Sequence, residues 1–207
     1  MRPLPRVHAV TDAAVLALED LGVRAAAIAA AGPAVALHAR DRNAGGAALT
    51  AVTTRFLSLA RPPEAAVFVN GHPDIAQGLG AQGVQLSTTD LAPEDARRVF
   101  PKGWIGCSVH SLEQAEKVAP HADLLFVGTI YPTPTHPDRE AAGPGLVESI
   151  ARLGVPVIAI GGVNVDRLTE LRDAGAWGVA AIRALWYAPD PAAAAMAFAE
   201  PWMDRDV

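Results

Sequence analysis

The feature of this sequence that most limits its fold is a regular alternation of short apolar runs with helical patterns, from one end to the other. Short apolar runs are typical of strands buried on both faces, and their alternation with helices predicts a parallel sheet. Strands are expected at 6–11, 34–39, 66–70, 83–86, 104–108, 124–128, 156–160 and 178–182. Helices are expected at 13–31, 47–60, 111–119, 165–174 and 191–199, among others.

These units number about eight, which matches a single-domain (β/α)8 TIM barrel, an α/β fold. We expect one such domain over residues 1–207. A doubly wound open sheet is the alternative, but the first strand runs into Thr11 and Asp12 without a GxGxxG turn, so a dinucleotide site has little support. In a barrel the active site lies at the carboxyl ends of the strands.

Composition excludes several classes of partner. The net charge of -5 leaves no basic surplus for a nucleic acid or an anionic membrane, and no apolar stretch is long enough to span a bilayer. The first ten residues lack the apolar run of a signal peptide, so we expect a cytoplasmic protein. A single cysteine, Cys107, excludes an internal disulfide and a cysteine-based metal cluster, and we expect it to pack in the core.

Two segments near the end of the chain indicate a phosphate site. Residues 155–162 read VPVIAIGG, and residues 178–185 read GVAAIRAL, so two buried strands each run into a turn of small residues. Backbone N–H groups at such turns bind a phosphate monoester without a cationic side chain. We expect the phosphate-binding residues to be Gly161, Gly162, Ala180 and Ala181.

Polar residues at the other strand ends converge on the same pocket if the barrel is formed. His38, Arg40 and Arg42 alternate, so they point to one side of an extended segment, and the arginines suit a phosphate or a carboxylate. The alternative is a solvated charged loop. Candidate substrate-binding residues on the remaining strands and on the loop after the sixth strand are Asn70, Ser108, Thr133 and Thr135.

Residues 132–144 form a long, proline-rich polar segment that we interpret as a lid over the pocket. It carries His136, and a histidine at this position suits proton transfer near neutral pH, although a lone loop histidine is often only solvated. His110 is interpreted as structural, because Ser111 and Gln114 form a capping box for the next helix. No HExxH, P-loop, CxxC or Ser-His-Asp pattern occurs in the sequence.

The motifs HAVTD, LHARDR, FVNGHPDIAQGLGAQGVQL, IGCSVHS, VGTIYPTPTH, VPVIAIGGVN and AGAWGVAAI follow one another over nearly the whole chain. In this order and spacing they resemble the family that joins thiamine phosphate synthases and TenI-type thiazole tautomerases. The resemblance implies a (β/α)8 enzyme of thiamine biosynthesis that binds a small phosphorylated thiazole.

Three positions depart from the pattern of the synthase branch, which typically reads QLRxK, ND and PTxTK. Here His38, Arg40 and Arg42 replace the first motif, Gly71 follows Asn70 in the second, and His136 replaces the lysine of the third. The HxRxR and VNG patterns favour the TenI-type branch, an isomerase that aromatises a carboxythiazole phosphate by a proton shift without metal or cofactor. The tautomerase base would fall at Thr129, so His136 or His38 is expected to supply the acid/base group, with Arg40 and Arg42 on the substrate carboxylate.

Two alternatives stay open at this point. A thiamine phosphate synthase would condense hydroxymethylpyrimidine diphosphate with thiazole phosphate, release pyrophosphate and use Mg2+, with Asp90 as the remaining acidic ligand. A regulatory homologue would bind the phosphate ligand without catalysis. A homodimer is possible on the basis of Trp104, Trp177, Trp186, Tyr187 and Trp202, which pack in the core or form a subunit face.

Overall fold

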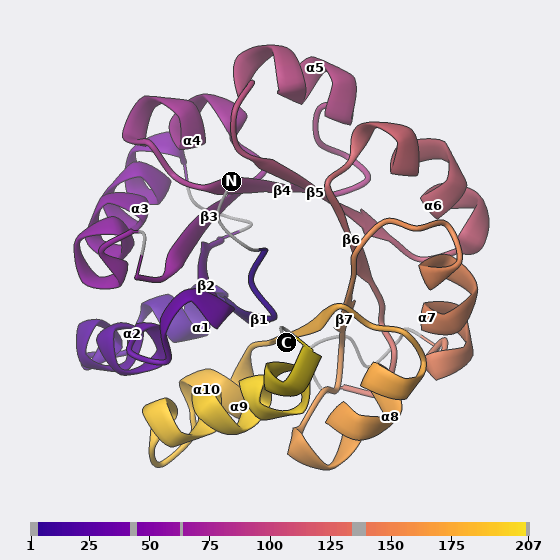
Figure 1. Cartoon of the computed structure of the whole chain (residues 1–207). Coiled ribbons are helices and arrows are strands. Elements are labelled where there is room, and N and C mark those ends of the chain that lie inside the picture. The colour runs from indigo at the N-terminus through magenta and orange to yellow at the C-terminus, as the bar shows by residue number, and fades with distance from the viewer. Residues whose placement is uncertain (1–3, 42–44, 63, 134–139, 206–207) are drawn as a thin grey trace.

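The computed structural model describes residues 4–41, 45–62, 64–133 and 140–205. Eight parallel strands form a closed barrel in chain order, and helices surround it (Figure 1). The strands are β1 Val7–Val10, β2 Val35–Ala39, β3 Ala66–Asn70, β4 Gly83–Leu86, β5 Trp104–Val109, β6 Leu124–Val127, β7 Val157–Ile160 and β8 Gly178–Ala181. The barrel closes where β1 pairs with β8, with Val7 opposite Val179. The predicted (β/α)8 barrel is therefore confirmed, and the open doubly wound sheet is excluded.

The helices are α1 Ala13–Leu16, α2 Leu21–Ala29, α3 Gly46–Ala60, α4 Pro73–Leu79, α5 Pro93–Val99, α6 Leu112–Val118, α7 Pro144–Ala151, α8 Leu168–Asp173, α9 Arg183–Trp186 and α10 Pro191–Ala199, with short 3-10 turns η1 Gly32–Ala34, η2 Ala119–His121, η3 Val165–Arg167 and η4 Glu200–Arg205. The single helix expected at 13–31 is two helices, α1 and α2. Both pieces turn apolar residues such as Val15 and Ile28 toward the barrel, so the apolar pattern continues across the break and does not reveal it.

Local chemistry sets where several helices begin. Proline stands in the first turn of α4, α5, α7 and α10, where its missing N–H has no intrahelical partner to lose. Asp12, Ser111 and Asp190 cap α1, α6 and α10 through side-chain oxygens that accept backbone N–H groups. Each such cap contributes about 1 kcal/mol. The expected capping box differs in one detail, because Gln114 accepts from the N–H of His110 rather than from that of Ser111.

Apolar packing forms two layers. The outer layer lies between the strands and the helices, and it contains Cys107, which is buried as expected. The inner layer fills the barrel lumen and consists of Val10, Ala36, Ala66, Phe68, Trp104, Leu124, Phe126, Ile158 and Ala180. Glycine at 83 and at 106 makes room for the two phenylalanines, because a Cβ atom there would lie 2.3 Å from Phe68 and 2.6 Å from Phe126. The lumen is therefore a packed core and not a channel.

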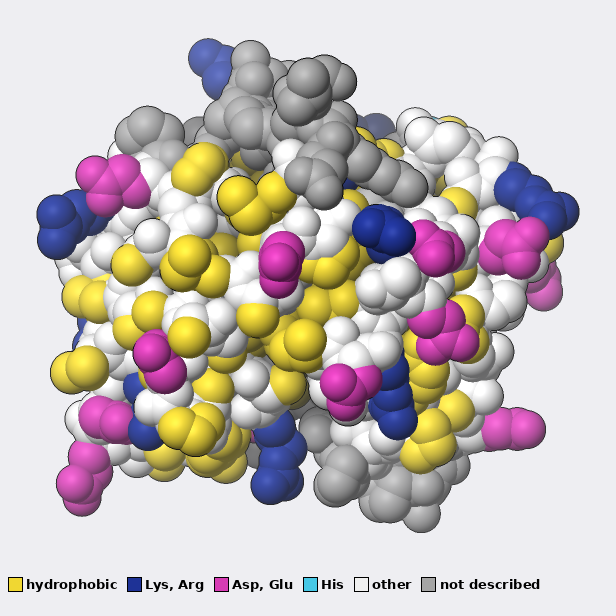
Figure 2. All heavy atoms as spheres, turned by 60° about the horizontal axis from the view of Figure 1, so that its bottom comes forward, with side chains coloured by type: hydrophobic (Ala, Val, Ile, Leu, Met, Phe, Trp, Pro, Cys, Tyr) yellow, Lys and Arg dark blue, Asp and Glu magenta, His cyan; other side chains and the backbone are white. Residues whose placement is uncertain are grey.

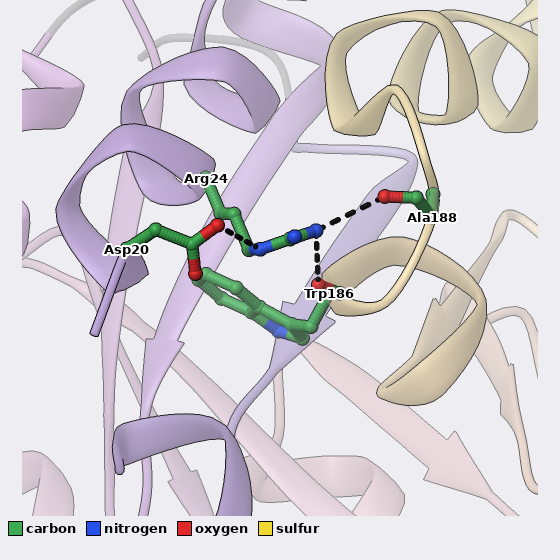
Figure 3. A network of polar contacts seen from close by, with 4 residues as sticks. All are labelled: Asp20, Arg24, Trp186 and Ala188. Carbon is green, nitrogen blue, oxygen red and sulfur yellow. Dashed lines mark hydrogen bonds and ion pairs between the residues drawn. The ribbon is translucent and has the colours of Figure 1, made fainter. Parts of the chain in front are cut away.

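Arg24 joins the beginning of the helical layer to its end (Figure 3). From α2 its guanidinium Nη1 donates to the backbone carbonyls of Trp186 and Ala188, both at 3.0 Å, while its Nε donates to Asp20 at 2.8 Å. The α2 and α10 helices lie side by side in Figure 1 at this seam. The arginine therefore ties together segments that are more than 160 positions apart in sequence, beside the β1–β8 closure.

None of the helices in the described part of the chain is long and apolar enough to cross a bilayer. Figure 2 shows the side where α8, α9 and α10 lie, with apolar side chains among charged side chains of both signs.

Trp186 and Trp202 are buried in the outer layer, whereas Tyr187 is 45% exposed. The homodimer stays a prediction.

Candidate functional site

A pocket of about 880 Å3 lies over the carboxyl ends of the strands, and polar and apolar side chains line it together. Its volume is within the range of small-molecule sites. The residues that line it follow or end β1 to β8, so the whole mouth of the barrel contributes. The site predicted at the strand ends is thus where the structure has its large pocket.

The four residues predicted to bind phosphate line one side of this pocket: Gly161 and Gly162 follow β7, and Ala180 and Ala181 are the last two residues of β8. A Cβ atom at Gly161 would lie 2.7 Å from Cγ2 of Thr129, and one at Gly162 would lie 2.7 Å from the carbonyl oxygen of Pro132. Gly162 also has a φ of 64°, a conformation that residues with a Cβ rarely adopt. Only glycine therefore lets the turn pass this close to the loop after β6.

Arg40 lines the pocket at the end of β2, as predicted. Its backbone is held by Thr11, whose buried hydroxyl shares its one proton between the carbonyls of His38 and Arg40 and accepts from the N–H of Arg40, all within 2.9 Å. The Arg40 guanidinium also donates to the Thr11 carbonyl at 3.3 Å. Arg183, at the start of α9, is a second cation in the pocket lining. Arg42 lies outside the described residues.

Three polar side chains from neighbouring strands form what we term the polar ladder: Asn70 on β3, Gln85 on β4 and Ser108 on β5. Nδ2 of Asn70 donates to Oε1 of Gln85 at 2.8 Å, and Nε2 of Gln85 donates to Oγ of Ser108 at 3.0 Å. All three line the pocket. The ladder lies across the barrel from the β7 and β8 turns, so the pocket has two chemically different sides.

His38 does not face the pocket mouth. It is completely buried in the lumen, 2.8 Å from the ring of His8 and 3.1 Å from Oδ1 of Asn70. Burial lowers the pKa of His38 to about 4, and hydrogen bonding with Asn70 and Gln85 only partly opposes this effect. The expectation that His38 and Arg40 lie together at the mouth needs correction. They do share a side of β2, but two residues rise by about 7 Å along a strand, which places His38 one layer lower.

Asp90, the predicted acidic ligand of a synthase, lines the pocket in the loop after β4. Its Oδ2 accepts from the N–H of Ser87 at 2.7 Å, and its Oδ1 lies 3.3 Å from where a Cβ atom of Gly71 would be. No group of three or more His, Cys, Asp or Glu side chains that could hold a metal occurs among the residues described here. Mg2+ in phosphate sites usually binds only one or two carboxylates, and substrate oxygens and water supply the other ligands. Asp90 alone is therefore compatible with such a site.

The remaining predicted residues divide into two groups. Thr129 and Thr133 line the pocket at the end of β6 and in the loop after it. Thr129 is 8% exposed and has no group that accepts a proton near neutral pH. Thr135 and His136 lie outside the described residues, as does the middle of the predicted lid. His110 lines the pocket as well, and its ring Nδ1 contacts the Gly128 carbonyl.

Two polar residues of this region were not predicted from the sequence. Gln85 and His8 each stand in an otherwise apolar strand, GVQL and VHAV. The sequence does contain a signal for them, namely a polar residue inside an apolar strand. Such a side chain needs a hydrogen-bond partner when the strand is buried on both faces. The partner comes from a neighbouring strand about 15 to 30 residues away in sequence, so only the barrel identifies it.

The fold and the pocket define a (β/α)8 barrel with one polar site at the carboxyl ends of its strands. The family model described as thiamine monophosphate synthase (TMP-TENI) matches residues 7–185, and the chain belongs to this family.

Individual relatives agree with this assignment. The thiamine-phosphate synthase of Thermus thermophilus is 43% identical over 169 residues, 80% of this chain and 81% of the relative. That of Methanospirillum hungatei is 41% identical over 175 residues, 82% and 84% of the two chains. The solved structure of thiamine phosphate pyrophosphorylase from Pyrococcus furiosus superposes with a TM-score of 0.80 at 31% identity, covering 94% of both chains.

These findings correct the predicted branch. The tautomerase, an isomerase of the TenI type, is wrong as the main reading, because the similar curated proteins are named thiamine-phosphate synthase at up to 43% identity. The synthase that was the alternative is the better supported reading. The departures at Gly71 and at the second strand were given too much weight, since differences at single positions of a pocket do not outweigh similarity over four-fifths of the chain.

Proposed function

We propose that this protein is a thiamine phosphate synthase, a transferase that joins a pyrimidinylmethyl diphosphate to a thiazole phosphate. The bond that forms links the thiazole ring nitrogen to the methylene carbon of the pyrimidine, and the bond that breaks is the one from this carbon to the diphosphate oxygen. Pyrophosphate leaves with the electron pair. The observation that carries the proposal is the similarity to proteins named thiamine-phosphate synthase over four-fifths of both chains.

The two sides of the pocket suit the two substrates. The turn after β7, with Gly161 and Gly162, and the end of β8, with Ala180 and Ala181, would bind the phosphate of the thiazole through backbone groups. The polar ladder on β3 to β5 would bind the edge of the pyrimidine ring, because planar heterocycles with several donors and acceptors need such fixed partners. Both rings would then meet over the lumen, which holds the reacting atoms close together.

The diphosphate needs positive charge as it leaves. Arg40 and Arg183 are the cations of the described pocket lining, and guanidinium groups bind phosphate oxygens in a bidentate fashion. A Mg2+ ion would be held by Asp90 and would neutralise further charge on the diphosphate. Thr133 lines the same region and would donate a hydrogen bond to a phosphate oxygen. Arg42, Thr135 and His136 stay candidates for the same group.

The test is a product assay on the purified protein. Hydroxymethylpyrimidine diphosphate, thiazole phosphate and Mg2+ should yield thiamine phosphate and pyrophosphate in equal amounts. Removing the charge with Arg40→Met should lower kcat/KM by about 100-fold, the typical effect of losing one group that stabilises developing charge. Arg98→Met is the matched control, because Arg98 is 81% exposed on α5 and should leave the rate unchanged. Absence of thiamine phosphate with both substrates at saturating concentration would overturn the proposal.

A further inference from the structure

A continuous chain of polar contacts runs from beneath the lumen to the pocket. Nε2 of His8 lies 3.3 Å from the carbonyl oxygen of Pro5, and Nδ1 of His8 lies 2.8 Å from Nε2 of His38. Nδ1 of His38 lies 3.1 Å from the carboxamide of Asn70, and the polar ladder continues through Gln85 to Ser108. The two histidines, which we term the lumen histidine pair, therefore connect a fixed backbone carbonyl to the substrate-facing side chains.

The lumen histidine pair is shielded from solvent and packed among aromatic rings. Both side chains are completely buried. The ring of His38 stacks on Phe68 at 4.9 Å between centroids, and the ring of His8 meets Phe68 and Phe126 edge-on at 5.3 and 5.1 Å. Burial lowers the pKa of both histidines, for His8 well below its ordinary value. Each ring is thus neutral near pH 7, with one nitrogen that donates and one that accepts.

Neutral rings allow only two directions for the chain of hydrogen bonds. With the Asn70 oxygen toward His38, the His38 Nδ1 donates, its Nε2 accepts from Nδ1 of His8, and the His8 Nε2 carries a lone pair. That lone pair faces the Pro5 carbonyl, which can only accept. Two acceptors then meet in a buried place, and an unmade buried hydrogen bond costs about 1–3 kcal/mol.

The opposite direction leaves no contact unmade. The Nε2–H of His8 donates to Pro5, and the Nε2–H of His38 donates to Nδ1 of His8. The amides of Asn70 and Gln85 then need only a half-turn, which exchanges oxygen and nitrogen atoms of similar size and keeps the heavy-atom positions. Asn70 donates to His38, Gln85 donates to Asn70, and the Ser108 hydroxyl donates to Gln85. Every member of the chain now pairs a donor with an acceptor.

We infer that the lumen histidine pair acts as a positioning device, which uses the Pro5 carbonyl to set the hydrogen-bond direction of the polar ladder and so presents Ser108 to the pocket as an acceptor. The Ser108 hydroxyl donates its proton to Gln85. The lone pairs of its oxygen are therefore available to accept a hydrogen bond from a ligand. The matching ligand group is an N–H donor, such as an amino group on a planar heterocycle. The assignment of this ligand group rests on the proposed function, in which the polar ladder binds the pyrimidine. The direction of the hydrogen bonds is independent of the proposed function.

The direction can be read by NMR without substrate. In protein labelled with 15N-histidine at pH 7, the expected result is that both lumen histidines carry their proton on Nε2, with Nδ1 resonating as an unprotonated ring nitrogen. A proton on Nδ1 of either ring, or a doubly protonated ring, would overturn the inference.

Two variants at His8 separate positioning from packing. His8→Gln keeps one acceptor and one donor, so His38 should stay protonated on Nε2 and the KM for the pyrimidine diphosphate should stay near the wild-type value. His8→Leu fills similar space without polar atoms, so His38 should move its proton to Nδ1 and reverse the ladder. Ser108 then presents a donor, and the KM for the pyrimidine diphosphate should rise by about tenfold, the factor of one neutral hydrogen bond, while the KM for thiazole phosphate changes little.

The readouts distinguish the possible failures. If His8→Leu does not fold, the wild-type tautomers and the His8→Gln kinetics still decide the question. An unchanged His38 tautomer in folded His8→Leu would overturn the positioning role. If the tautomers are as expected but no variant makes thiamine phosphate, the proposed function fails and the hydrogen-bond direction stands.

Discussion

Gly71 and Asp90 face each other across the ends of β3 and β4, and a Cβ atom at Gly71 would lie 3.3 Å from Oδ1 of Asp90. Any side chain placed at position 71 therefore enters the immediate surroundings of the carboxylate. This relationship makes the charge of the candidate Mg2+ site adjustable at a single residue.

Gly71→Asp should tighten Mg2+ binding, because the new carboxylate lies beside Asp90 and two carboxylates bind this ion better than one. We expect the Mg2+ concentration at half-maximal rate to fall by about tenfold, together with a loss of about 1 kcal/mol in stability from the φ of 76° at this position. Gly71→Asn is the matched control, since it has nearly the same shape and strain without the charge. Equal Mg2+ dependence in both variants would contradict Asp90 as a ligand.

Phosphate binding at the turn after β7 should be weakened by a single added methyl group. In Gly162→Ala the new Cβ meets the Pro132 carbonyl at 2.7 Å, so the turn must move. The KM for thiazole phosphate should rise by about tenfold or more, because even a small displacement weakens several N–H contacts at once. Gly78→Ala is the control, because this helical glycine has open space around it. If the KM for the pyrimidine diphosphate rises instead, the assignment of the two sides of the pocket is wrong.

Stability should fall in mild acid because of His38. Its folded pKa is about 4, whereas the unfolded side chain takes up a proton near 6.5. As pH falls from 6.5 to 4, His38 binds a proton in the unfolded state but not in the folded state, so the free energy of unfolding decreases. The shift corresponds to an upper figure of about 3 kcal/mol, and His8 acts in the same direction. Urea unfolding at pH 7 and pH 4.5 measures the effect, and His38→Gln should lose less stability than the wild type between the two values.

The hydrogen bonds of Arg24 that join α2 to the segment between α9 and α10 should contribute more to stability than an exposed ion pair does. Arg24→Ala removes two charged hydrogen bonds to backbone carbonyls and one to Asp20, and we expect a loss of about 1–2 kcal/mol in the free energy of unfolding. Arg152→Ala is the comparison, because Arg152 forms an ion pair with Glu148 in which both side chains are more than half exposed, and such pairs contribute little. Chemical denaturation of both variants tests this, and equal losses would show that Arg24 does not hold the seam.

Cys107 should be unreactive in the native protein. Burial raises the pKa of its thiol to about 12, with the charges of Glu94 and Asp123 adding to the effect, so the thiolate is scarce near pH 8. A thiol reagent should label it only at the rate at which the protein unfolds. Rapid labelling under native conditions would mean that β5 opens locally far more often than its burial implies.

The fold and the candidate site were predictable to different extents. The break between α1 and α2 was missed because the apolar pattern does not change there. Among the site residues, the glycine turns and Arg40 were found from local patterns, whereas Gln85 and His8 needed neighbours from other strands. Similarity over four-fifths of the chain supports the synthase reading and outweighs the departures at Gly71 and His136.

The sequence by itself determined the eight strand positions, the barrel and the glycine turns after β7, because strand patterns and turn chemistry act over a few neighbouring residues. Only the tertiary structure decided that His38 lies in the lumen rather than at the mouth, that it meets His8 and Asn70, and that Gly71 lies beside Asp90. The physical reason is that the barrel's stagger and closure set the height of each inward-facing residue. Two side chains on one face of a strand thereby reach different layers, and residues distant in sequence reach the same one.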